Sequence, residues 1–76
     1  GSRLIEELDI GHCQQCTKIG DALALLPNLR VLDICEMIGL QDICLEGLQR
    51  SGARLESLRS MGAWRITSAK VAEVMR

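Results

Sequence analysis

The sequence predicts an α/β fold, built as a solenoid of about three repeats with short parallel strands on a concave side and helices on a convex side. The first observation behind this prediction is a repeated segment. IEELDIGHC, LRVLDICEM and LESLRSMGA begin at residues 5, 29 and 55 and share aliphatic residues at their first and fourth positions. The second is composition: hydrophobic residues make up 47% of the chain with Trp64 as the single aromatic, so the core must be aliphatic. The third is that apolar residues between the repeated segments recur at helical spacing.

Each repeated segment is predicted to contain one short strand. Alternate residues of a strand point to opposite faces, so strands stacked in parallel about 4.8 Å apart bury a continuous aliphatic ladder. One repeat alone could not bury this face, whereas stacked neighbours can. We expect the ladder to consist of Leu8, Leu32, Leu58, Ile10, Ile34 and Ser60.

The segments that follow the strands are predicted to return as helices over residues 19–26, 41–50 and 68–76. Pro27 ends the first helix, because proline cannot continue a helix. Gly52, which tolerates a left-handed conformation, ends the second. Thr67 is expected to cap the N-terminus of the third. Right-handed crossovers between the parallel strands follow from chain chirality.

The repeated pattern resembles the leucine-rich repeat, L-x-x-L-x-L-x-x-C/N, and in particular its cysteine-containing subtype, found in F-box substrate receptors. In that subtype an I-T-D element opens the convex helix, and LQDICLEGL and ITSAKVAEV fit this frame, whereas the shorter first repeat fits less well. The resemblance implies a leucine-rich-repeat segment over residues 3–76, with repeats at about 4–28, 29–54 and 55–76. Gly1 and Ser2 are interpreted as remnants of tag removal.

The motif GHCQQC offers a zinc site, a redox pair or a disulfide. A structural zinc site needs four ligands, and His12, Cys13 and Cys16 supply three. The resemblance instead implies that Cys13, Cys16 and Cys44 pack in the core, while Cys35 follows an inward residue and is expected to face outward. We therefore expect reduced thiols, no metal and no cofactor, and a small zinc or redox domain ranks last among the alternatives.

Charge and composition exclude several classes of function. The formal net charge is −1 and the charges are interspersed, so no basic stripe is present to bind nucleic acid. No apolar run approaches the length of a membrane span and no signal peptide is evident, so we expect no membrane partner and an intracellular, reducing, cytoplasmic location. Neither a Gly-rich phosphate loop nor a second polar cluster accompanies His12, so we expect that the protein is not an enzyme.

The concave face of the sheet is the predicted binding surface, because solenoids use this face for recognition. We expect three rows of outward residues, namely Glu7, Val31 and Ser57; Asp9, Asp33 and Arg59; and Gly11, Cys35 and Met61. Trp64, in the turn after the last strand, is expected to lie over the end of the core, with an interface anchor as the alternative. The predicted partner-binding residues are Glu7, Asp9, Val31, Asp33, Cys35, Ser57, Arg59, Met61 and Trp64.

These observations predict a non-catalytic protein-interaction module whose concave face binds a polypeptide with a basic residue opposite the two aspartates. One alternative is a structural piece of a larger complex, joined through its repeat ends. The resemblance adds another, the substrate-receptor fragment of a ubiquitin ligase. Uncovered repeat ends would also allow the protein to associate with itself.

Overall fold

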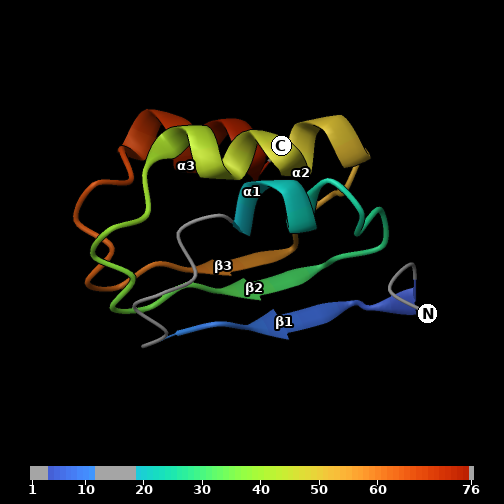
Figure 1. Cartoon of the computed structure of the whole chain (residues 1–76), viewed down its shortest axis with the longest axis horizontal. Coiled ribbons are helices and arrows are strands. Elements are labelled where there is room, and N and C mark those ends of the chain that lie inside the picture. Colours follow the sequence, from blue (N-terminus) through green and yellow to red (C-terminus); the bar gives the residue numbers. More distant parts are fainter. Residues whose placement is uncertain (1–3, 12–18, 76) are drawn as a thin grey trace.

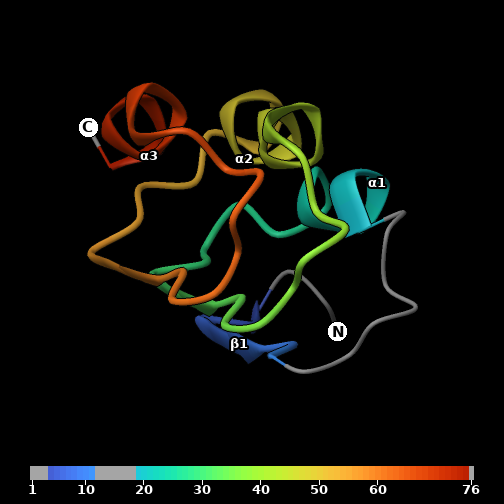
Figure 2. The same ribbon diagram turned by 90° about the vertical axis from the view of Figure 1, so that its left-hand side faces the viewer.

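A computed structural model describes residues 4–11 and 19–75 and places them in two layers, a parallel sheet and a row of helices over one of its faces (Figures 1 and 2). The elements in chain order are β1 (Glu7–Asp9), α1 (Ile19–Leu23), β2 (Val31–Asp33), the 3-10 helix η2 (Asp42–Leu45), α2 (Glu46–Ser51), β3 (Ser57–Arg59) and α3 (Ser68–Val74). The predicted α/β class is therefore confirmed. None of the helices in the described ranges is long and apolar enough to cross a membrane.

The three strands pair in parallel in the order β1-β2-β3. Their register is the predicted one, with rows Glu7–Val31–Ser57, Leu8–Leu32–Leu58 and Asp9–Asp33–Arg59. The middle row points toward the helices, where Leu32 is fully buried and Leu8 and Leu58 are half-buried. The two outer rows therefore belong to the opposite face of the sheet.

The chain leaves β2 and β3 through two turns with the same hydrogen bonds. The N–H of Met37 donates to the carbonyl of Ile34 at 3.1 Å, and the N–H of Ala63 donates to that of Ser60 at 3.0 Å. The N–H of Glu36 donates to the carbonyl of Met61 at 2.8 Å and so joins the first turn to the second. The sheet pairing thus continues beyond the strands themselves.

The helices are shorter than predicted. The first ends at Leu23 rather than at residue 26, because Leu25 and Leu26 form tighter turns whose N–H groups donate to residues three positions earlier. The second, predicted over 41–50, divides into η2 and α2, and α2 ends at Ser51, followed by the C-cap Gly52, which has a φ of 79°. Thr67 is the N-cap of α3, as predicted. Its side chain accepts a hydrogen bond from the N–H of Lys70.

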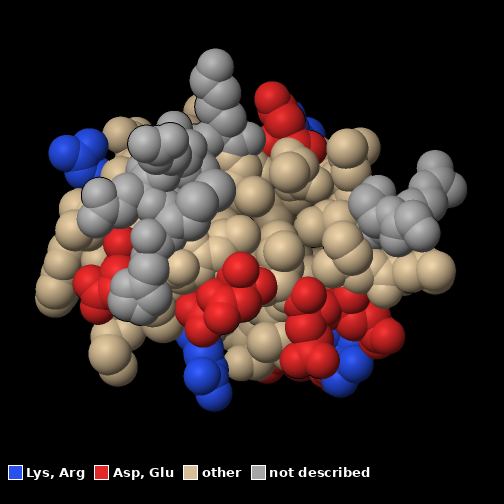
Figure 3. Space-filling view, turned by 60° about the horizontal axis from the view of Figure 1, so that its bottom comes forward, with Lys and Arg blue, Asp and Glu red and all other residues tan. Residues whose placement is uncertain are grey.

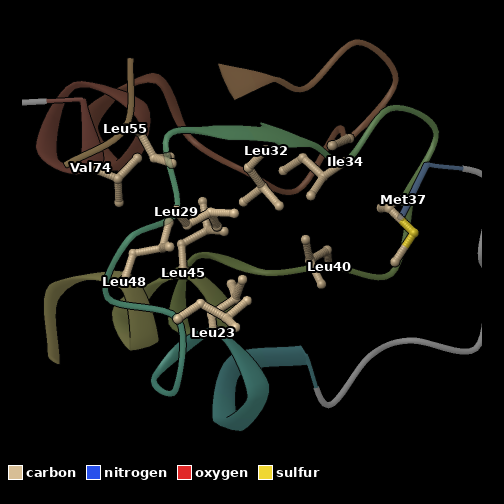
Figure 4. Packing of buried hydrophobic residues seen from close by; sticks show 12 residues of the cluster. Leu23, Leu29, Leu32, Ile34, Met37, Leu40, Leu45, Leu48, Leu55 and Val74 are labelled. Atoms are coloured by element: carbon tan, nitrogen blue, oxygen red, sulfur yellow. The ribbon is translucent and has the colours of Figure 1, made fainter. Parts of the chain in front are cut away.

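The core lies between the sheet and the helices, and its members among the described residues are Leu, Ile, Val, Ala and Met side chains, with no aromatic ring (Figure 4). The members of each layer face one another across it: Leu32 and Ile34 come from the sheet, and Leu23, Leu45 and Leu48 come from the helices. Each of these five side chains is at most 1% exposed. Burial of this kind stabilises the fold by about 1.5–3 kcal/mol for each large aliphatic side chain. One face of the sheet is thereby committed to the core, and the other lies outside it.

Candidate functional site

The exposed face of the sheet carries the residues that the sequence singled out. We call it the open sheet face and define it by Glu7, Asp9, Val31, Asp33, Ser57 and Arg59. The same residues, with Leu8, line an open depression of about 420 Å³. Acidic side chains gather on the sheet side of the molecule, with basic side chains beside them at its lower rim (Figure 3).

Two aspartates lie side by side at the centre of this face. Asp9 on β1 is in register with Asp33 on β2, and each carboxylate accepts a hydrogen bond from the N–H two residues further along the chain. The distances are 2.9 Å from Gly11 to Asp9 and 3.0 Å from Cys35 to Asp33. Both side chains are therefore held in the same turn geometry at the carboxyl ends of neighbouring strands.

One oxygen of each carboxylate lies beside Gly11. A Cβ at this position would lie 3.2 Å from Oδ1 of Asp9 and 3.3 Å from Oδ1 of Asp33. The absence of a side chain at Gly11 thus leaves room for both oxygens on the same side of the sheet. Like charges on directly paired strand positions repel each other, so this arrangement favours a cation that lies against both carboxylates.

Arg59 completes the row, since it is in register with Asp33 on the third strand and is exposed. Three charged groups thus follow one another across the sheet in the order acidic, acidic, basic. Neighbouring opposite charges stabilise a sheet, which places the excess negative charge at the β1 end of the row.

Cys35 lies beside Asp33 and is a half-buried free thiol. Its hydrogen bond with the Asp33 carboxylate raises the pKa of the thiol above its ordinary value, and burial and the negative charge of Asp33 act in the same direction. A raised pKa keeps the thiol protonated at neutral pH and lowers its reactivity, because the thiolate is the nucleophile. Cys35 was predicted to face outward on the same side as Asp33, and its contact with the Asp33 carboxylate places the half-buried thiol on that side.

Sequence reasoning missed a second charged row, which lies one residue before the strands. Arg30 donates from Nη1 to Oε1 of Glu6 at 2.9 Å and from Nε to Oε2 of Glu56. These two carboxylates raise the pKa of Arg30 and so hold it charged. The predicted register, extended by one residue toward the N-terminal ends of the strands, would have found it, because Glu6, Arg30 and Glu56 occupy equivalent positions. An arginine between two carboxylates on neighbouring strands is thus an arrangement that this sheet already uses.

Two large apolar side chains follow β3. Met61 is 79% exposed and Trp64 is 80% exposed. The expectation that Trp64 covers the end of the core is therefore wrong. Ala63 and Ile66 pack into the core from this turn instead, and the turn directs Trp64 toward solvent. An indole this exposed is typical of the aromatic anchors found in protein interfaces.

The predictions for His12, Cys13 and Cys16 fall outside the described residues. Among the residues that are described, no group of three His, Cys, Asp or Glu side chains could hold a metal ion. Cys44 packs against the core, as the sequence predicted.

No known protein family, no curated protein and no solved structure matches the chain.

Proposed function

We propose that this chain is a leucine-rich-repeat solenoid segment that acts as a non-catalytic protein-interaction module. Its open sheet face binds an extended polypeptide that carries a lysine or arginine. The basic side chain of this polypeptide lies against Asp9 and Asp33. The observation that carries the proposal is that Oδ1 of Asp9 and Oδ1 of Asp33 both lie beside Gly11, which has no side chain to cover them.

The physical argument rests on charge and shape. Two carboxylates in register repel each other, and a cation between them converts that repulsion into two attractive contacts. Backbone hydrogen bonds already orient both carboxylates, so little side-chain entropy is lost when the partner binds. Val31 and the exposed Met61 add apolar surface for the residues that flank the basic one.

An array of extended peptides tests the proposal. The peptides carry lysine, arginine or glutamine at the central position and vary in their flanking apolar residues. We expect the protein to retain lysine and arginine peptides in preference to their glutamine counterparts. Retention that is equal for all three central residues would contradict the proposal.

Two double variants identify the surface. In Asp9→Asn with Asp33→Asn, the amide oxygens can still accept the hydrogen bonds from Gly11 and Cys35, so the turns are kept while the charges are lost. We expect this variant to lose most of the preference for basic peptides. The matched control is Asp21→Asn with Glu46→Gln, which removes two negative charges from the helix layer and is expected to bind as the unmodified protein does.

A further inference from the structure

The two edges of the sheet are complementary to each other. β1 forms one edge and β3 the other. At the inner strand Leu32 is 0% exposed, whereas Leu8 and Leu58 at the edges are only half-buried, so within residues 4–11 and 19–75 the aliphatic ladder is less covered at its two ends than at its centre. Apolar surface of this kind is stabilised when another strand covers it.

The hydrogen bonds between the strands repeat from one step to the next. The N–H of Ile10 donates to the carbonyl of Asp33 at 2.9 Å, and the N–H of Ile34 donates to that of Arg59 at 2.7 Å. Ser60 is the next member of this series, and its N–H points toward the outer edge of β3 because successive residues of a strand alternate. If the series continued into a second copy of the chain, the N–H of Ser60 would donate to the carbonyl of Asp9 on the outer edge of β1 of that copy.

A second series runs in the other direction. The N–H of Val31 donates to the carbonyl of Glu6 at 3.0 Å, and the N–H of Ser57 donates to that of Arg30 at 3.1 Å. If this series continued into a second copy, the N–H of Glu7 of that copy would donate to the carbonyl of Glu56 of the first. Both edges thus present the donors and acceptors that a parallel strand of the same sequence requires.

The charges at the two edges are also complementary. Continuing the register places Arg59 of one copy between its own Asp33 and Asp9 of the next copy. Arg30 shows that this sheet accommodates an arginine between two carboxylates on neighbouring strands. One neighbouring contact opposes the pairing, since Glu56 would lie beside Glu6 of the next copy. Each of these glutamates is already paired with Arg30 of its own copy, which reduces the repulsion.

We propose that the protein associates head to tail with itself, β3 of one copy pairing in parallel with β1 of a second copy. The register places Ser57, Leu58 and Arg59 opposite Glu7, Leu8 and Asp9 of that copy. Because the two joined surfaces are different, the interface is heterologous and can extend beyond a dimer. This proposal does not depend on polypeptide binding by the open sheet face.

Sedimentation velocity of the purified chain under reducing conditions tests the proposal. We expect the mass to rise above the monomer mass of 8.4 kDa as the protein concentration increases, and to fall again in high salt. Arg59→Glu and Asp9→Arg each place like charges at the junction and are each expected to weaken association by roughly tenfold or more. Arg50→Glu makes the same change of charge on α2 and is expected to leave association unchanged.

An equimolar mixture of the Arg59→Glu and Asp9→Arg proteins distinguishes a head-to-tail junction from a symmetric pairing of β3 edges. Across the two proteins the altered charges are again opposite, so we expect the mixture to regain the association that each protein lost. Circular dichroism of each variant, matching that of the unmodified protein, excludes unfolding as the cause of the loss. A protein that stays monomeric at every concentration would overturn the proposal, and so would a symmetric pairing of β3 edges, in which Asp9→Arg has no effect.

Discussion

Asp42 holds Thr67 through both of its carboxylate oxygens. Oδ1 accepts from the N–H of Thr67 at 2.8 Å, and Oδ2 accepts from its hydroxyl at 2.6 Å. The hydroxyl oxygen of Thr67 in turn accepts from the N–H of Lys70 and caps α3. A single carboxylate at the start of η2 thus holds the residue that caps α3, 25 residues further along the chain.

Thr67→Ala is expected to lower the free energy of unfolding by about 1–2 kcal/mol, because it removes the helix cap and the hydrogen bond to Asp42. Thr67→Ser keeps the hydroxyl and is the matched control, with an expected loss of less than about 0.5 kcal/mol. Urea denaturation followed by circular dichroism measures both values. Equal losses in the two variants would show that the methyl group, rather than the hydroxyl, matters at this position.

The Asp42–Thr67 contact also predicts how stability changes with pH. The hydrogen bonds from the hydroxyl and N–H of Thr67, together with the charge of Lys70, lower the pKa of Asp42 below its ordinary value of 3.8. A carboxylate with a lowered pKa in the folded state contributes stability that is present above its unfolded pKa and is lost as the pH falls through its folded pKa. The contribution is therefore present in full near neutral pH, begins to fall below about pH 4, and is lost as the pH falls through the lowered pKa of the folded state.

We expect Asp42→Asn to be less stable than the unmodified protein at pH 7 and the difference between them to shrink as the pH falls below about 4. Denaturation midpoints of the two proteins, measured across the acid range, test this expectation. A difference that stays constant with pH would mean that the charge of Asp42 does not contribute. Glu46→Gln, also on the helix layer, is the control for a general loss of negative charge.

Gly47 permits the close approach of α2 to α1. A Cβ at this position would collide with the carbonyl oxygen of Gly20 and would lie 3.0 Å from the N–H nitrogen of Ala24. Alanine would favour the helix itself by about 1 kcal/mol, but two helix backbones must separate to admit it. We expect Gly47→Ala to destabilise the protein by about 1–3 kcal/mol net, as overpacking does in other cores.

Gly52 provides the contrast. Its φ of 79° is left-handed, and no atom lies within 4 Å of the position that a Cβ would occupy. Alanine at this position should cost about 1 kcal/mol through backbone strain alone, and Gly52→Asn should cost less because asparagine tolerates this conformation. Urea denaturation of Gly47→Ala, Gly52→Ala and Gly52→Asn separates the steric requirement at Gly47 from the conformational requirement at Gly52. A stabilised Gly47→Ala protein would show that the helices are not packed as closely as described.

The sheet was predictable from the sequence because the alternation of apolar residues fixes its register. A shift of one residue would have turned Leu32 and its partners toward solvent, so only one alignment was acceptable. The Asp9–Asp33–Arg59 row followed directly from that alignment. The cap at Thr67 was predictable for a similar reason, since a local preference and the end of an apolar pattern coincide there.

The helix layer was less predictable. The division between η2 and α2 and the early end of α1 were not predicted. The close approach of Gly20 and Gly47 is a tertiary contact that periodicity does not encode. The position of Trp64 was also mistaken, because the neighbouring Ala63 takes the core position in that turn. The contact between Asp42 and Thr67 depends on the stacking of two turns and has no local signal.

The most direct test of the central claim is a titration followed by nuclear magnetic resonance, with isotope-labelled protein and the best-retained lysine or arginine peptide. The N–H groups of Gly11 and Cys35 donate to the carboxylates of Asp9 and Asp33, so they are sensitive reporters of a cation at that site. We predict that the largest chemical-shift changes occur at these two amides and along β1, β2 and β3. Changes confined to α1, α2 and α3, with Gly11 and Cys35 unaffected, would contradict the account.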